Sequence, residues 1–296
     1  MNDTGFIIQT APQFDFARTV LSHGWLMLPP FSWDGASGTL AYTYQSRAGA
    51  VLRLRMTAAE GGVRVFSPDC ARLTAGLRAE MTAAVSTMLN TRLDLSGFYK
   101  VMAAHTGYGW LEAERRGRIL IAPSLWEDLA KVLLTTNCSW SQTVNMCRQL
   151  CRLGAPHPAV EDCQAFPRAE RVAALDFDAF AERVRAGYRS AYLHELARKI
   201  ADGEINLEAW LDLDSDDFYR TVKSLKGFGD YAAGTLARMY GHFDKIAIDT
   251  AAHAMFAELR NDGVKGSAAD IKAHYERYAE WRGLVMWMDI MRHYGE

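Results

Sequence analysis

The chain has 296 residues, 49% of them hydrophobic and 23% charged, so it can bury a full core as one large or two medium domains. Its formal net charge of −2 sets it apart from the strongly basic domains that bind DNA mainly by neutralising phosphates. Five cysteines without a Cys-x-x-Cys pair favour reduced thiols over a disulfide framework, and no apolar run approaches the roughly 20 residues that cross a bilayer. We therefore expect a cytoplasmic protein that does not contact a membrane.

The first 92 residues combine short strand-like runs with turn signals, such as Asp34-Gly35 and Gly61-Gly62. Strands are predicted at residues 5–10, 25–28, 39–45, 50–56 and 62–66. Helical stretches at residues 13–23 and 70–90 would cover one face of the resulting sheet. We expect an N-terminal domain, residues 1–92, with an antiparallel sheet and two helices.

From about Asp94 onward the pattern is helical, with short breaks. Helices are predicted at residues 95–105, 124–135, 139–153, 168–175, 177–186, 191–201 and 216–223, followed by a second helix at 231–240. Asp214 or Ser215 would cap the helix at 216–223, and Gly241 would close the one at 231–240. Residues 93–296 therefore read as an all-α domain.

A short turn with the sequence Leu-Lys-Gly-Phe-Gly-Asp joins two of these helices at residues 225–230. Its glycines, Gly227 and Gly229, can adopt positive φ and let the backbone approach a ligand closely. Phe228 between them is expected to pack inward. The N–H groups that open the next helix, beginning near Tyr231, would then form a site for a phosphate oxygen.

Asp249 follows the second glycine by twenty residues. It ends a short apolar, strand-like run at residues 245–248 and precedes a helical pattern at 251–260. At this place a helix dipole keeps a carboxylate ionised, and a fixed, ionised carboxylate can act as a base. Taken alone, the same position would favour a structural helix cap, but the hairpin at this spacing reverses that preference toward catalysis.

These motifs resemble those of the helix-hairpin-helix DNA glycosylase superfamily, in which a Leu-x-Gly-apolar-Gly hairpin precedes a catalytic aspartate. Residues 186–193 are similar to a Gly-Tyr-Arg segment of the 8-oxoguanine and alkylpurine branches, and residues 133–139 are similar to their wedge loop. The resemblance implies an α+β protein: a small antiparallel-sheet domain, then an all-α glycosylase domain with its helix-hairpin-helix at about 216–240.

The resemblance also implies a partner, damaged double-stranded DNA, and a role for each motif. Asp249 would be catalytic, and Gly227, Gly229 and Tyr231 would bind a DNA phosphate. The wedge that fills the gap left by an extruded nucleotide would consist of Asn137 and Cys138. The candidates for the base pocket are Tyr231, Trp140, Tyr188 and Trp287, although aromatic side chains at helical spacing more often belong to a core.

Two departures from the superfamily narrow the chemistry. Lyase members carry a lysine two residues after the second hairpin glycine, where this chain has Tyr231, and tyrosine cannot form an imine. A monofunctional enzyme that uses water is therefore expected, unless Lys223 or Lys226 replaces that lysine. Because no cysteine follows Cys163, the C-terminal iron–sulfur cluster of other branches is not expected, and we predict no cofactor and no metal.

The damaged base is less well defined by these motifs. An alkylated purine is favoured narrowly, because Tyr231 and Thr235 stand where the 8-oxoguanine branch has a lysine and a cysteine. An 8-oxoguanine-type glycosylase is the second reading. A non-catalytic helix-hairpin-helix DNA-binding protein is the third, although such a module needs neither Asp249 nor so large a helical frame. The protein is expected to be a monomer.

Overall fold

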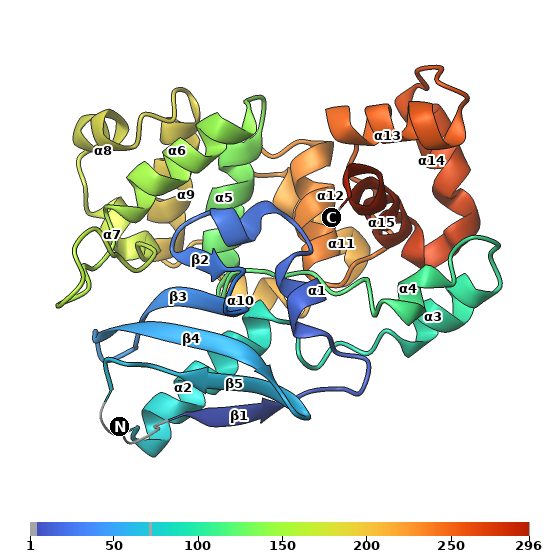
Figure 1. Cartoon of the computed structure of the whole chain (residues 1–296). Helices are drawn as coiled ribbons and strands as arrows, with labels where there is room; N and C mark the ends of the chain where they lie inside the picture. Colours follow the sequence, from blue (N-terminus) through green and yellow to red (C-terminus); the bar gives the residue numbers. More distant parts are fainter. Residues whose placement is uncertain (1–4, 71–72, 296) are drawn as a thin grey trace. The chain divides into compact units, whose positions relative to one another are not determined.

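The computed structural model describes residues 5–70 and 73–295 (Figure 1). Residues 1–4, residue 296 and residues 71–72 of one predicted helix lie outside this range. The chain forms two compact units, Met1–Ile205 and Asn206–Glu296.

The first unit contains one antiparallel sheet of five strands in the order β1-β5-β4-β3-β2 (Figure 1). The strands are β1 (Phe6–Gln9), β2 (Phe31–Asp34), β3 (Thr39–Gln45), β4 (Val51–Ala59) and β5 (Gly62–Phe66). The register pairs Tyr42 with Leu54 and Met56 with Val65, and all four are buried. Because alternate residues of a strand point to the same side, these pairs make one apolar face. The predicted α+β class is thereby confirmed.

The segment before β2 differs from its prediction. Residues 25–28 were expected to form a strand, but Gly24–Met27 is a 3₁₀ helix, η1. The indole of Trp25 donates a hydrogen bond to Asp128 at 2.6 Å, and the N–H of Leu28 donates to the carbonyl of Trp25. These contacts with a distant part of the chain override the local strand preference. The strand β2 instead begins directly after Pro29 and Pro30.

Helices surround the sheet in the first unit. Two contacts bring the sheet and α2 together: the guanidinium of Arg78 lies 5.0 Å from the ring centre of Phe6, and the hydroxyl of Tyr44 donates to Glu80. The helices are α1 (Phe16–Val20), α2 (Ala75–Met88), α3 (Ser96–Ala103), α4 (Trp110–Ala113), α5 (Leu125–Thr135), α6 (Trp140–Cys151), α7 (Ala169–Ala173), α8 (Phe177–Val184) and α9 (Arg189–Ala201).

A buried polar network ties α5 to the sheet. Glu127 accepts a hydrogen bond from Tyr42 of β3 and pairs with Lys131 at 2.6 Å, with both charged side chains almost fully buried. Residues from the sheet and from the helices therefore share one core, which accounts for a compact unit that extends to Ile205. The expected boundary between residues 92 and 93 lies where strands give way to helices, and as a domain boundary it stays a prediction.

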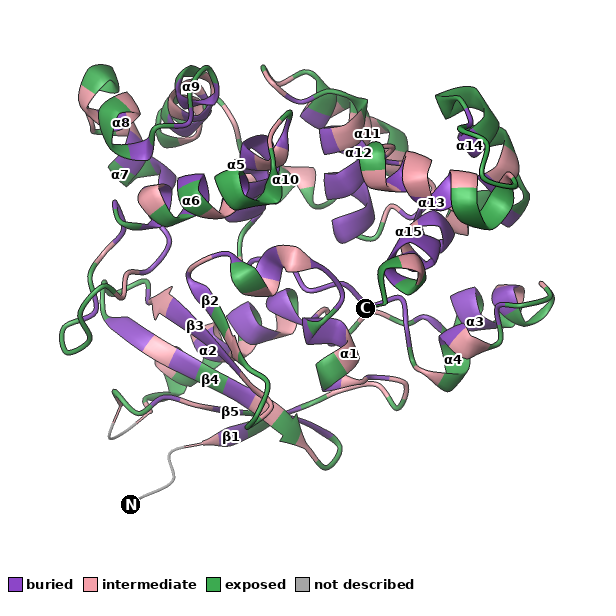
Figure 2. Ribbon diagram, turned by 45° about the horizontal axis from the view of Figure 1, so that its top comes forward, coloured by how far each residue is buried: buried purple, intermediate pink, exposed green. Residues whose placement is uncertain are grey.

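The second unit is helical. Its helices are α10 (Leu207–Trp210), α11 (Ser215–Lys223), α12 (Asp230–Met239), α13 (Thr250–Arg260), α14 (Ala268–Tyr275), the 3₁₀ helix η2 (Glu276–Trp281) and α15 (Arg282–Tyr294). Asp214 caps α11 through a hydrogen bond from the N–H of Asp217, as predicted. Both α12 and α15 are buried along most of their length (Figure 2). No helix in the described ranges is long and apolar enough to span a bilayer.

The segment that leads to Asp249 is held between α12 and α15. A Cβ added at Gly234 of α12 would lie 2.8 Å from the carbonyl oxygen of Ile246, and one at Gly283 of α15 would lie 2.0 Å from that of Lys245. The N–H of Gly283 donates to the carbonyl of Phe243 at 2.7 Å. Residues 245–248 are irregular rather than a strand, because these contacts with two helices replace strand pairing. The close packing fixes the backbone just before Asp249.

Candidate functional site

The two glycines of the hairpin between α11 and α12 have different backbone conformations. Gly227 has a φ of 87°, in the region that favours glycine, whereas Gly229 is extended and serves as the N-cap of α12. The expectation of positive φ therefore holds for Gly227 and is wrong for Gly229. Phe228 is buried between them, as predicted. Apart from the residues next to it in the chain, no described residue has an atom within 4 Å of the place where a Cβ on Gly229 would stand, so the turn faces open space.

The hairpin also carries a carboxylate that the motif does not require. Asp230, the first residue of α12, pairs with Lys223 at 2.5 Å and accepts a hydrogen bond from the hydroxyl of Tyr219 at 2.6 Å. These partners lower the pKa of Asp230. The amides that open α12 have no partners within the helix and favour an anion, so a negative side chain beside them competes with a phosphate.

Asp249 is the N-cap of α13. Its Oδ1 accepts a hydrogen bond from the N–H of Ala252 at 2.8 Å, and the side chain is half-buried. Within residues 5–70 and 73–295, Oδ2 accepts no hydrogen bond. The carboxylate is thus fixed by one oxygen while the other is available to act on a substrate.

One face of α12 carries three side chains with polar groups near Asp249. Tyr231, Thr235 and Arg238 are spaced by four and three residues and therefore lie on the same side of the helix. Arg238 is only 5% exposed, and its guanidinium carbon lies 4.5 Å from the ring centre of Trp287 on α15. Burial lowers the pKa of Arg238 to about 10, whereas the nearby side chains of Tyr231 and Asp249 act to raise it. The structure thus brings three predicted residues, Asp249, Tyr231 and Trp287, around this arginine.

Sequence reasoning missed Arg238 because no motif contains it. The available signal was a cation in the otherwise apolar run of residues 232–239, seven residues after Tyr231. A buried charge, here in the last turn of α12, is uncommon unless it is paired or functional. Its position on the face of Tyr231 points to the same site.

The predicted wedge loop joins α5 to α6 in the first unit. Asn137 is exposed with a φ of 48°, and its side-chain amide donates to the hydroxyl of Tyr188 at 3.2 Å. The buried Arg189 holds the loop from beneath, donating to the carbonyl of Thr136 at 3.0 Å and to that of Asn137 at 3.1 Å. Two motifs far apart in the sequence therefore meet at this loop.

The remaining predicted residues of the first unit have different surroundings. Cys138 turns its thiol inward, where it donates to the carbonyl of Leu134 at 3.2 Å. Trp140 starts α6 and is 38% exposed, with its ring against Gly24. Tyr188 is 50% exposed, and the amide of Asn137 lowers its pKa. Within this unit Asn137 and Tyr188 form an exposed pair, whereas Cys138 packs against the end of α5.

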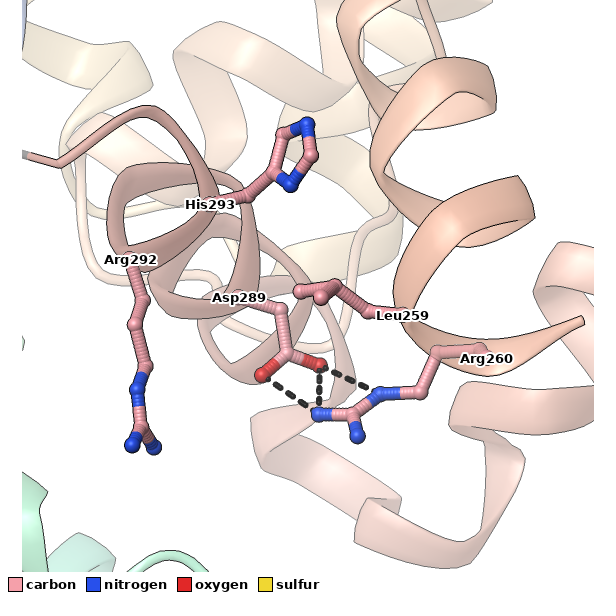
Figure 3. A pocket seen from close by; sticks show the side chains of 5 residues that line it. All are labelled: Leu259, Arg260, Asp289, Arg292 and His293. Atoms are coloured by element: carbon pink, nitrogen blue, oxygen red, sulfur yellow. Dashed lines mark hydrogen bonds and ion pairs between the residues drawn. The ribbon is translucent and has the colours of Figure 1, made fainter. Parts of the chain in front are cut away.

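A cavity of about 370 Å³ lies at the other end of α13 from Asp249 (Figure 3). Asp289 in its wall is bonded to Arg260 by two contacts of 2.8 Å and accepts a hydrogen bond from Tyr275. Arg260 at this end follows Asp249 by eleven residues, about 16 Å along the helix at 1.5 Å per residue. A ligand bound there would not reach the carboxylate of Asp249.

Comparison with known proteins shows the fold. No protein-family profile matches the chain, and no curated protein matches it. Among solved structures, MBOgg1 in complex with a low-affinity DNA ligand aligns with a TM-score of 0.77 and 16% identity, covering 100% of this chain and 98% of that one. The 8-oxoguanine glycosylase/lyase of Clostridium acetobutylicum aligns with a TM-score of 0.75 and 15% identity, covering 98% of this chain and 96% of that one. The 3-methyladenine DNA-glycosylase of Archaeoglobus fulgidus aligns with a TM-score of 0.75 and 15% identity, covering 98% of each chain. At such identities the likeness establishes a common fold, the one that the hairpin motifs predicted.

Proposed function

We propose that this protein is a base-excision-repair DNA glycosylase, which hydrolyses the N-glycosidic bond of a damaged base extruded from duplex DNA. The observation that carries the proposal is the placement of Asp249. Its carboxylate is fixed by the N–H of Ala252, after a clamped backbone and a two-glycine hairpin, in a fold shared with DNA glycosylases. Such a fixed carboxylate suits the stabilisation of a positively charged sugar.

The reaction begins with extrusion of the damaged nucleotide, which costs a few kcal/mol and less for a poorly paired or poorly stacked base. The amides at Gly229 and Tyr231 hold a phosphate of the strand. As the bond between C1′ and the base breaks, the sugar gains oxocarbenium character, and Asp249 stabilises that charge and orients water toward C1′. The products are a free base and an abasic site.

The wedge loop supports this reaction by keeping the duplex open. Asn137 is exposed, and the bonds of Arg189 to the loop carbonyls hold its backbone in place. We assign to Asn137 the insertion into the gap left by the extruded nucleotide, with Tyr188 beside it. Cys138 supports the loop, because its thiol donates a hydrogen bond to the carbonyl of Leu134.

The enzyme is monofunctional in this proposal. Tyr231 cannot form an imine, and the ammonium of Lys223 is paired with Asp230. Borohydride reduction of a reacting mixture should leave no covalent protein–DNA adduct, whereas an 8-oxoguanine glycosylase/lyase used as a control should be trapped. A trapped adduct that disappears in Lys223→Gln or Lys226→Gln would assign a lyase instead.

The sequence motifs favour an alkylated purine as substrate, with 8-oxoguanine second. The fold does not separate the two, since the solved structures that resemble this chain include an 8-oxoguanine glycosylase/lyase and a 3-methyladenine DNA-glycosylase.

Release of bases from duplex oligonucleotides tests the function. The substrates carry 3-methyladenine, 7-methylguanine, 8-oxoguanine, hypoxanthine or uracil, and hot alkali reveals abasic sites. The wild type should cleave at least one substrate, and Asp214→Asn, which changes another helix cap of the same unit, should keep that activity. Tight binding without cleavage of any substrate would replace the enzyme with a non-catalytic DNA-binding protein.

A further inference from the structure

Two side chains on one face of α12 have polar atoms that are buried without a hydrogen-bond partner anywhere in the described chain. These atoms are Nε and Nη1 of Arg238 and Oγ1 of Thr235. Buried donors, and buried charges above all, are normally satisfied, so the exceptions call for a ligand or another explanation. Three such atoms within one helical turn make this the most unusual polar cluster of the second unit.

The surroundings of the cluster match the site already described. Tyr231 lies one turn before Thr235 on the same face, and the indole of Trp287 lies over the guanidinium of Arg238. Asp249 is near enough to act on Arg238 electrostatically, but its carboxylate is bonded to the N–H of Ala252 instead. The positive charge is therefore beside the catalytic carboxylate without being engaged by it.

We propose that Arg238, assisted by Thr235, binds the extruded base and selects a neutral base with carbonyl or ring-nitrogen acceptors over a cationic alkylated purine. Oxidation and deamination produce bases of this neutral kind. The inference rests on the proposed glycosylase function and replaces the narrow preference for alkylated purines that the sequence motifs give.

The chemistry of the guanidinium supports this selection. Arginine offers five N–H donors and no acceptor, and its fork pairs with adjacent acceptors such as O6 and N7 of guanine or hypoxanthine. In 8-oxoguanine N7 carries a hydrogen, and the carbonyl oxygens O6 and O8 are the acceptors that the guanidinium would bind. Methylation of guanine at N7 removes the N7 acceptor and adds a positive charge. A fixed guanidinium then loses a hydrogen bond and repels the base in a site shielded from water.

Trp287 adds an aromatic surface to the same site. Its ring is only partly exposed and lies over the guanidinium of Arg238, so a base bound by this guanidinium would lie beside the indole. Aromatic faces stack on neutral bases as well as on cationic ones. The discrimination between neutral and cationic bases therefore belongs to Arg238, which carries the charge.

The test compares single-turnover excision of neutral bases (8-oxoguanine, hypoxanthine, uracil) and of a cationic base (7-methylguanine) by the wild type and Arg238→Met. Methionine keeps a long apolar side chain against Trp287 and removes the charge. We expect the wild type to prefer a neutral base. Arg238→Met should lower that rate by about tenfold or more, the usual worth of a bidentate base contact, and leave or raise the rate on 7-methylguanine.

A second variant guards against misfolding. Thr235→Val has nearly the same shape and lacks the hydroxyl, so it should lower excision of the neutral base several-fold and spare 7-methylguanine. An unchanged ratio of neutral to cationic rates in both variants would overturn the inference while leaving the glycosylase intact. A wild-type preference for 7-methylguanine would overturn it as well. Failure of the proposed function is a separate result, in which Asp249→Asn keeps the wild-type rate on every base.

Discussion

At the scale of single residues, Asp249 combines two roles that the sequence presented as alternatives. It caps α13 through Oδ1, and Oδ2 is unengaged within the described ranges. The cap and the catalytic function therefore use different oxygens of one carboxylate. Substitutions can separate them, because asparagine caps a helix about as well as aspartate does.

Asp249→Ala should lower the free energy of unfolding by about 1 kcal/mol, whereas Asp249→Asn should change it by only a few tenths. The reason is that alanine leaves the N–H of Ala252 without an acceptor. Urea unfolding followed by circular dichroism measures both values. Equal losses in the two variants would show that the negative charge, rather than the cap, stabilises α13.

Arg238, which the sequence analysis did not single out, differs from Asp249 because no sequence pattern marks it. Asp249 follows a hairpin at a fixed spacing, which a pattern reveals. The role of Arg238 depends on Trp287, almost fifty residues later, and on the lack of a hydrogen-bond partner for its Nε and Nη1 atoms among the described residues. Both facts depend on how α12 and α15 pack, which local patterns do not encode.

At the scale of elements, the hairpin was predictable because its conformation is local. Gly227 has positive φ and Phe228 is buried, and the residue type at each position predicts that property. The stretch at residues 25–28 was not predictable in this way, since Trp25 is held by Asp128 from a distant helix. The apolar residues of this stretch pack into the core and do not pair in the sheet.

Removal of the carboxylate from the hairpin should strengthen binding to DNA. Asp230→Asn frees Lys223 and takes a negative charge from the first turn of α12, where a phosphate would bind. The dissociation constant for an undamaged duplex should fall several-fold at low salt, and its logarithmic salt dependence should steepen by about one. Fluorescence anisotropy over a range of salt concentrations measures both.

The matched control is Asp217→Asn, at the far end of α11, which removes the same charge from another first turn. Equal strengthening in both variants would assign the effect to net charge and not to the hairpin.

The wedge loop should depend on Arg189 for its shape. Arg189→Met leaves the carbonyls of Thr136 and Asn137 without their buried donor, so the free energy of unfolding should fall by about 2 kcal/mol. Excision should also slow, because Asn137 loses its fixed position. Thermal unfolding and single-turnover kinetics report the two effects. A stable variant with wild-type kinetics would show that the loop does not need this support.

At the scale of the whole molecule, the first unit is built from both the sheet and the helices that follow it. Glu127 and Asp128 of α5 receive hydrogen bonds from Tyr42 and Trp25, which belong to the first 92 residues. The change from strands to helices was clear in the sequence. The shared core was not, because it rests on contacts between residues about a hundred positions apart.

A fragment of residues 93–296 should therefore not fold as the intact chain does. It would expose the apolar partners of the sheet. It would also deprive Glu127 of the hydrogen bond from Tyr42 and Asp128 of the one from Trp25, a cost of about 1–3 kcal/mol for each group. Gel filtration and near-ultraviolet circular dichroism would detect the loss. A compact fragment with native-like spectra would support the boundary predicted between residues 92 and 93.

In the proposed mechanism Asp249 stabilises the sugar as its bond to the base breaks, and single-turnover excision by Asp249→Asn tests this role most directly. The variant keeps the helix cap and should bind the same damaged duplex with an affinity within a few-fold of the wild type. Its excision rate should fall by about 100-fold or more, as when a charge-stabilising group is removed from other active sites. Excision at the wild-type rate with unchanged binding would contradict the account.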